Sequence, residues 1–168
     1  MKKMTYIASL FAFGLSSGVA YADFNTELNG SVLKSDDLKL FALGGSYYFD
    51  QVNTNKGPLA EATFLDQQSS VDAVFTRFDF GDDNVNAWAI GGTYVLQGTG
   101  LYLNAAVSHI NDYSADTYSL GGGYYLSRDW AVSANTEFDK DLNYQGFSLA
   151  SKKLFNLGGD TFVSLAGE

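Results

Sequence analysis

The stretch Trp88-Ala-Ile-Gly-Gly-Thr-Tyr-Val-Leu96 decides the fold, because the chain repeats its pattern. Segments of the same length begin at Phe41, Tyr118 and Phe147, and the four starts are separated by 47, 30 and 29 residues. Large apolar side chains alternate with small or polar ones, and a period of two predicts β-strands rather than helices. Between copies lie a second alternating segment and a short turn sequence. Each repeat therefore predicts one antiparallel hairpin.

The two faces of the predicted strands differ in chemistry. One face carries large apolar and aromatic groups, and the other carries Gly, Ala, Ser, Thr, Asn and Glu. Eight residues span ~27 Å, and a strand tilted by ~40° then covers ~20 Å of the membrane normal, close to the ~25 Å apolar band of outer-membrane barrels. Aromatic residues gather at both ends of the apolar face, which indicates membrane girdles. The predicted girdle residues are Phe41, Phe49, Trp88, Tyr94, Tyr118, Trp130, Phe138, Phe147 and Phe155.

These patterns predict an all-β chain that forms an antiparallel up-and-down transmembrane β-barrel, with nine or ten strands present. The first repeat interval exceeds the others by about 17 residues, too few for two further spanning strands. We therefore expect an insertion at about residues 50–68, which forms a short helix, a loop in the lumen or an extension of the next strand. The expected strands are 24–33, 38–49, 69–80, 84–96, 100–110, 116–127, 130–139, 143–154 and 160–168.

Glycines in the middle of strands need a reason, since glycine weakens a strand. The run Gly121-Gly122-Gly123 is the longest of them. Inward glycines leave room for curvature and for another group in the lumen, and the alternative interpretation is a β-bulge.

The first 22 residues have the three parts of a secretory signal peptide. Lys2 and Lys3 are positive, residues 7–15 are apolar, and Ala20-Tyr21-Ala22 has the spacing of a cleavage site. We expect cleavage after Ala22, which leaves an outer-membrane β-barrel domain over residues 23–168. Removing the two lysines leaves eight basic against 19 acidic residues, a net charge of −11. This charge disfavours nucleic acid as a partner.

Enzymatic patterns are missing from the sequence. The chain contains no Cys and a single His, His109, which is expected near a strand end, beside Asn111 and Asp112, as a solvated residue of the turn region. No H-x-x-x-H pair, nucleophile elbow or phosphate-binding loop occurs. We therefore expect no enzyme activity, no catalytic residue, no cofactor and no metal site.

A pore selects solutes by its diameter and by charged side chains at its narrowest point. Charged residues expected on the inward face are therefore the candidates for the pore lining, and Glu61 joins them where the insertion folds inward. The predicted pore-lining residues are Glu27, Glu61, Arg77, Asp79, Glu137 and Lys152.

Two neighbouring segments resemble a known family. Gly45-Ser-Tyr-Tyr-Phe-Asp-Gln-Val52 and Gly57-Pro-Leu-Ala-Glu-Ala-Thr-Phe-Leu65 are similar to a signature near the N-terminus of the general bacterial porins of Gram-negative bacteria. The resemblance implies an outer-membrane barrel that passes small solutes. Members of the family are usually longer, the strand count is odd, and Glu168 is not a terminal aromatic residue. We therefore expect an N-terminal portion of a larger barrel, with a closed small barrel as the alternative.

The leading functional hypothesis is a porin in the cell outer membrane that allows passive diffusion of small hydrophilic solutes. One alternative is a small non-conducting outer-membrane barrel with a structural or adhesive role. The other is a soluble exported β-protein that binds a ligand on its polar face. The expected partners of a porin are outer-membrane lipid and lipopolysaccharide, the barrel assembly machinery and small solutes, and the oligomeric state, including a homo-oligomer, stays open.

Overall fold

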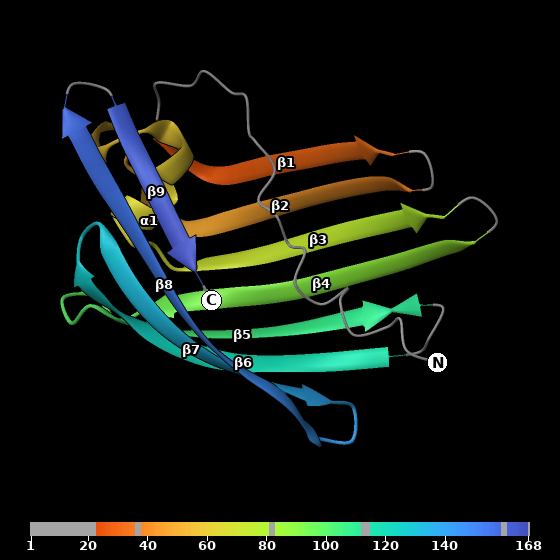
Figure 1. Cartoon of the computed structure of the whole chain (residues 1–168). Coiled ribbons are helices and arrows are strands. Elements are labelled where there is room, and N and C mark those ends of the chain that lie inside the picture. The colour runs from red at the N-terminus through yellow and green to blue at the C-terminus, as the bar shows by residue number, and fades with distance from the viewer. Residues whose placement is uncertain (1–22, 36–37, 81–82, 112–114, 159–160, 168) are drawn as a thin grey trace.

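The computed structural model describes residues 23–35, 38–80, 83–111, 115–158 and 161–167, and the predicted signal peptide lies outside this part of the chain. In the described residues, each strand lies next to its neighbour in sequence, and together they make one antiparallel sheet (Figure 1). The strands are β1 (Phe24–Lys34), β2 (Lys39–Val52), β3 (Ser70–Asp79), β4 (Asn84–Val95), β5 (Leu101–Ile110), β6 (Ala115–Ser127), β7 (Trp130–Asp139), β8 (Tyr144–Gly158) and β9 (Thr161–Gly167).

The up-and-down, all-β architecture is therefore confirmed, and the predicted strand ends are close to the observed ones. The main difference lies in β8, which continues to Gly158 instead of ending at residue 154. Two glycines allow the tight turn between β4 and β5, because Gly98 and Gly100 adopt positive φ angles of 77° and 76°. Side chains rarely tolerate that conformation, so glycine is suited to both positions.

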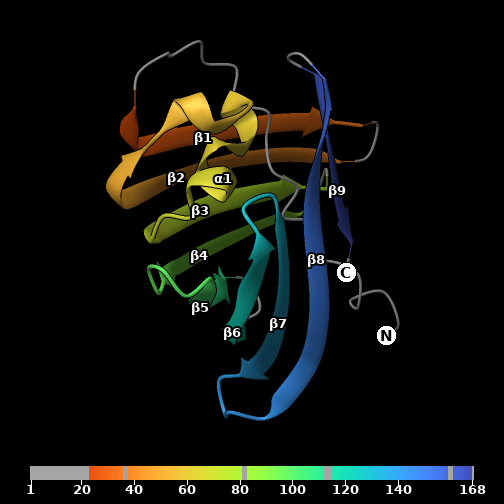
Figure 2. The ribbon, with the colours of Figure 1, turned by 90° about the vertical axis from the view of Figure 1, so that its left-hand side faces the viewer.

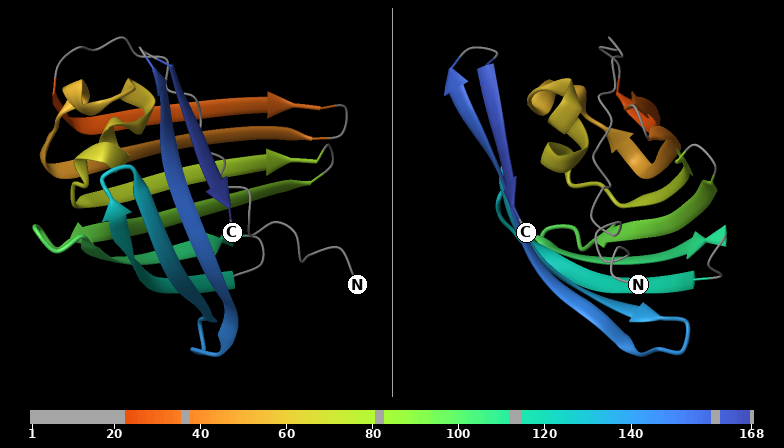
Figure 3. Two further views of the ribbon diagram at one scale, coloured as in Figure 1. Left: turned by 60° about the vertical axis from the view of Figure 1, so that its left-hand side comes forward. Right: turned by 45° about the vertical axis from the view of Figure 1, so that its right-hand side comes forward.

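The sheet is strongly curved but not closed. Figure 3 shows that the strands curve, so that the sheet has a concave and a convex face. β1 and β9 are the two edge strands, and no backbone pairing joins them within the described residues. The observed shape is that of an open barrel wall.

The insertion occupies residues 53–69, between β2 and β3. It contains two 3₁₀ turns, η1 (Thr54–Lys56) and η2 (Leu59–Glu61), followed by the short helix α1 (Ala62–Asp66). Figures 2 and 3 show that it lies on the concave side of the sheet. The prediction of a short helix is confirmed, and the alternative of an extended next strand is wrong, because β3 begins only at Ser70.

Buried residues gather where the insertion meets the wall. Tyr48, Val52 and Ala62 form a small core, and Phe24 packs against them. The convex face is different, because it exposes many large apolar side chains, with Leu28 at 76% as the most exposed. Burial of apolar surface stabilises a protein in water by ~25 cal/mol per Å². A face this apolar therefore indicates a surrounding that is not water.

The mid-strand glycines provide room for neighbouring side chains. A Cβ atom at Gly123 would overlap the Tyr102 ring and the carbonyl oxygen of Val132. The β5–β6 pairing runs without a break from residue 115 to residue 124, so the bulge interpretation is wrong for Gly121-Gly122-Gly123.

Within the described residues, no helix has the length and apolarity to cross a membrane.

Candidate functional site

The convex face carries all nine residues predicted as a girdle. Cross-strand pairing joins positions of equal orientation, as in Phe75 with Trp88 and Tyr118 with Phe138. The nine residues follow this alternation on their strands, and all but Phe138 are exposed. Their gathering on one face is therefore established, while their position at the two membrane interfaces stays a prediction.

Two residues predicted to line the pore, Arg77 and Asp79, do not face inward. Both lie on the convex face of β3, because they share the alternation of Phe75 and pair with Phe41 and Lys39 of β2. Arg77 donates to Asn84 Oδ1 at 3.1 Å, and Asp79 lies 3.7 Å from the Lys39 ammonium. β3 has Phe residues on both faces, Phe75 and Phe78, so aromatic residues alone do not assign its orientation. Charges at a strand end can also face outward, beyond the apolar band.

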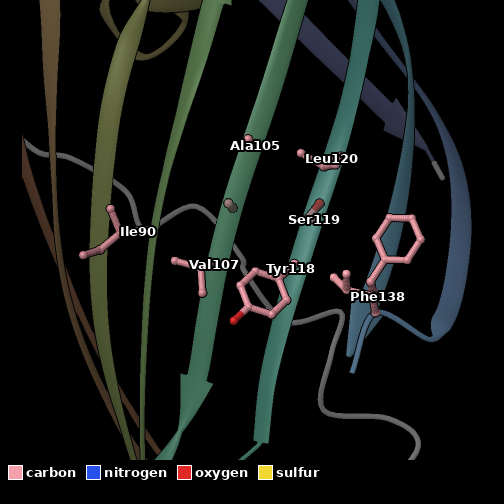
Figure 4. A pocket seen from close by; sticks show the side chains of 9 residues that line it. Ile90, Ala105, Val107, Tyr118, Ser119, Leu120 and Phe138 are labelled. Carbon is pink, nitrogen blue, oxygen red and sulfur yellow. The ribbon is translucent and has the colours of Figure 1, made fainter. Parts of the chain in front are cut away.

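A hollow of about 680 Å³ also lies on the convex face. Figure 4 shows side chains that line it on strands β4 to β7. It forms because Ala105 is small and stands among larger groups. The hollow therefore belongs to the apolar outer surface and not to a polar path. Its larger lining side chains are Ile90, Val107, Tyr118, Leu120, Phe138 and Leu142.

The concave face holds the other wall residues predicted to line a pore. Glu27 of β1 accepts a hydrogen bond from the Tyr48 hydroxyl at 3.2 Å. Glu137 of β7 stands opposite Ser119 and is exposed. Lys152 of β8 stands opposite Ala131. These three side chains share the concave side with the insertion, as predicted, but their role in solute passage is a proposal.

Glu61 connects the insertion to β8 on the concave side of the sheet. Its Oε2 lies 2.6 Å from the ammonium of Lys152 on β8, and the two side chains are 15% and 36% exposed. The same ammonium lies 4.8 Å from the ring centre of Phe64 in α1. Phe64 in turn contacts Tyr125 of β6, with ring centres 5.7 Å apart. An ion pair, a cation–π contact and an aromatic contact therefore meet at one junction.

Arg128, in the turn between β6 and β7, makes a second connection. Its guanidinium donates to the carbonyl oxygen of Leu65 at 3.4 Å and to that of Lys56 at 3.3 Å. These oxygens belong to the last residue of η1 and to a residue of α1. A single arginine therefore contacts two elements of the insertion.

Asp66 organises the insertion from within. Its side chain is 2% exposed and forms an ion pair with Lys56. It also accepts from the backbone N–H of Asn53 at 3.0 Å and from the amide of Gln68 at 2.9 Å. Burial acts to raise the pKa of Asp66, but the bonds from Lys56, Asn53 and Gln68 outweigh burial and hold the pKa below its ordinary value. The carboxylate is therefore charged, and it closes the insertion into one body.

The sequence-based interpretation missed Arg128, Tyr48 and Tyr125. A signal for the two tyrosines was present, since Tyr47-Tyr48 and Tyr124-Tyr125 are adjacent pairs in alternating strands. Neighbouring residues of a strand face opposite sides, so one tyrosine of each pair had to face inward. Arg128 lies in a turn, where alternation gives no orientation.

His109 lies near the end of β5, as expected, but it is not a solvated turn residue. Its side chain is 25% exposed, and its Nδ1 is 2.5 Å from Asp116 Oδ1 on the convex face. Its ring lies 5.7 Å from that of Trp88.

In the described part of the chain, no group of three or more His, Cys, Asp or Glu residues is placed to hold a metal ion.

Comparisons with known proteins agree with this geometry. The family model described as “Putative general bacterial porin” matches residues 1–137. Among solved structures, the outer membrane protein Omp33 of Acinetobacter baumannii is similar to the chain, with a TM-score of 0.66 and 22% sequence identity. The alignment covers 83% of this chain and 60% of Omp33, so the chain spans 60% of that protein's length. At this identity the likeness concerns the fold. No curated protein sequence matches the chain.

Proposed function

The chain belongs to the family described as “Putative general bacterial porin”, and from that premise we propose that it forms the wall of a pore for passive diffusion of small hydrophilic solutes. Membership makes it a porin-like protein of the outer membrane. The solutes and the passive mode of transport are the proposal. The same premise favours a channel-like role over catalysis, and we propose no enzymatic step.

The observation that carries the proposal is the contrast between the two faces of the sheet. The convex face exposes large apolar groups, among them Leu28, Leu103 and Leu120 at 76%, 59% and 54%. The concave face bears Glu27, Glu137 and other polar groups. Lipid accepts the first kind of surface and water the second, as in transmembrane barrels. This contrast also argues against the soluble, ligand-binding alternative.

The proposed pore also requires export, insertion into the outer membrane and a lipid surrounding. Export would use a signal peptide cleaved after Ala22, and insertion would need the barrel assembly machinery. Outer-membrane lipid and lipopolysaccharide would then surround the convex face.

The non-conducting barrel remains the second candidate, because the insertion occupies part of the concave side (Figure 2). A lumen filled by protein would give a structural barrel without a solute path. The contacts of Glu61 and Arg128 are compatible with such a filling.

Conductance separates the two candidates. The full-length protein should be purified from outer membranes, checked for folding by its electrophoretic mobility before and after heating, and added to planar lipid bilayers. A diffusion pore gives discrete current steps that increase in proportion to salt concentration, and it admits small sugars into liposomes. Folded protein that gives neither current nor sugar uptake would support the non-conducting barrel.

A further inference from the structure

A second hollow of the convex face, of about 650 Å³, is lined by residues of β7, β8 and β9. Lys153 lies in the middle of it, because it pairs with Trp130 on one side and with Leu165 on the other. Much of the remaining lining is apolar, with Phe155 and Ala166. The first hollow has no charged side chain in its lining, whereas this one contains an ammonium group. It therefore joins an apolar surface to a charge.

The hollow lies at one end of the wall, where β7 begins and β8 ends (Figure 1). Trp130 and Phe155 belong to the predicted aromatic girdle, and each is 41% exposed. Tryptophan and lysine have an apolar body and a polar tip, which suits them to the level where the apolar part of a membrane meets the lipid headgroups. We therefore expect the ammonium of Lys153 to lie beside headgroups.

An acidic residue in the β6–β7 turn accompanies this lysine. The Nζ of Lys153 lies 2.8 Å from Asp129 Oδ2, and the two side chains are 29% and 41% exposed. The Ser127 hydroxyl donates to Asp129 Oδ1 at 2.5 Å. The pair does not use up either group, because an ammonium has three N–H donors and a carboxylate offers about four acceptor positions. A positive and a negative group are thus both open to a ligand.

Two aromatic rings hold the lysine in place. Its ammonium lies 5.6 Å from the ring centre of Trp130 and 6.0 Å from that of Phe155. The face of an aromatic ring attracts a cation. The indole N–H of Trp130 donates to Ser151 Oγ at 3.1 Å, which fixes the orientation of that ring. The charged pair is therefore preformed and does not depend on a flexible side chain finding its position.

The two charges select among lipid headgroups. Lys153 attracts a headgroup that carries only negative charge, but Asp129 repels it, so the pair as a whole gives little net attraction. A headgroup with a phosphate and an ammonium can place each group on its opposite charge. Ethanolamine carries N–H donors for the carboxylate, whereas choline has none. The phosphates of lipopolysaccharide would face Asp129 without such a donor.

We propose that this hollow binds one phospholipid with an ethanolamine headgroup, which places its phosphate on Lys153, its ammonium on Asp129 and an acyl chain against Phe155 and Leu165. The inference goes beyond the proposed function, because it requires a chain in a membrane and not a conducting pore. It gives a role to a charged pair on the outer face, away from the solute path.

Lipid binding to the folded protein tests the inference. The full-length protein in detergent should be titrated with dioleoyl-phosphatidylethanolamine, dioleoyl-phosphatidylglycerol and dioleoyl-phosphatidylcholine, and native mass spectrometry should count the lipids bound. The three lipids share their acyl chains, so a difference in occupancy reports the headgroup. The wild type should retain one ethanolamine lipid in preference to the other two.

Two variants separate the charges. Asp129→Asn should lower the affinity for the ethanolamine lipid by about tenfold, as expected for the loss of one hydrogen bond between charged groups. The same variant should bind phosphatidylglycerol more tightly than the wild type does, because Lys153 is then unbalanced. Lys153→Gln should weaken the binding of both lipids. A merely structural ion pair would not exchange one lipid preference for another.

The pair of Lys39 and Asp79 supplies the matched control, because it lies on the same face at the other end of the wall, 3.7 Å apart. Lys39→Gln and Asp79→Asn should leave the three occupancies unchanged. Equal binding of the three lipids to the wild type, displacement of the ethanolamine lipid by an equal concentration of lipid A, or an unchanged preference in Asp129→Asn would each overturn the inference. The wild-type comparison tests it even where a variant fails to fold.

Discussion

Asp66 shows how one side chain can hold a short segment in shape. The insertion has only a five-residue helix and two 3₁₀ turns, which are too short to be stable alone. Hydrogen bonds from Lys56, Asn53 and Gln68 converge on the Asp66 carboxylate. A buried carboxylate that loses such donors is costly, so we expect these hydrogen bonds to Asp66 to stabilise the folded insertion.

The pKa of Asp66 gives the first prediction. Because the folded protein holds this pKa below the ordinary value of 3.8, ionised Asp66 stabilises the insertion above that value. The contribution declines as the pH falls through the folded-state pKa, which lies lower still. Asp66→Asn should lower the local stability of residues 53–69 by about 1–3 kcal/mol at neutral pH. Hydrogen-exchange mass spectrometry should show wild-type and variant protection converging below pH 3.8.

The control for Asp66 is Asp79, an acidic residue that also pairs with a lysine. Asp79→Asn removes the ion pair with Lys39 on the convex face, which lies far from the insertion. Protection of residues 53–69 should not change. A wild-type insertion whose excess protection over Asp66→Asn persists at pH values well below 3.8 would contradict the assignment.

The strand is the scale at which the two environments separate. Each strand presents alternate side chains to the convex and the concave face, so adjacent residues experience different surroundings. On β6, Leu120 is exposed on the convex face, whereas Ser119 faces inward opposite Glu137. β3 shows the limit of this argument, because Arg77 lies on the apolar face near the strand end.

The pair on β6 gives the second prediction. Leu120→Arg places a cation in the apolar band and should destabilise the membrane-inserted protein by about 2–4 kcal/mol. Ser119→Arg places the same cation on the concave side beside Glu137 and should cost much less. Reversible urea unfolding in lipid vesicles measures both free energies of unfolding. Similar losses for the two variants would mean that the convex face does not contact lipid.

At the scale of the whole molecule, the sheet is a curved wall with two free edges, and the chain spans 60% of the length of Omp33. The described concave side carries Glu27, Glu61, Asp66, Asp72, Glu137 and Asp139, and among basic residues Lys56, Arg128 and Lys152. Acidic groups outnumber basic ones among these residues and leave an acidic surface. Such a surface favours cations in a pore.

This balance gives the third prediction. Glu137→Gln removes one inward negative charge and should shift the reversal potential in a potassium chloride gradient toward lower cation preference. Asp79→Asn removes one negative charge on the convex face and should not change it. A wild-type channel that prefers chloride would show that the described wall does not dominate selectivity.

The sequence by itself determined the all-β, up-and-down fold, the positions of the strands and the aromatic face, because alternation and turn residues are local properties of each hairpin. It also placed an insertion after β2 from the length of one repeat interval. Only the tertiary structure decided that Arg77 and Asp79 face outward, because β3 carries phenylalanine on both faces. Only the tertiary structure joined Glu61 to Lys152 and the insertion to Arg128. These groups are far apart in sequence, and they meet because the curvature of the sheet brings β6 to β8 toward the insertion on its concave side.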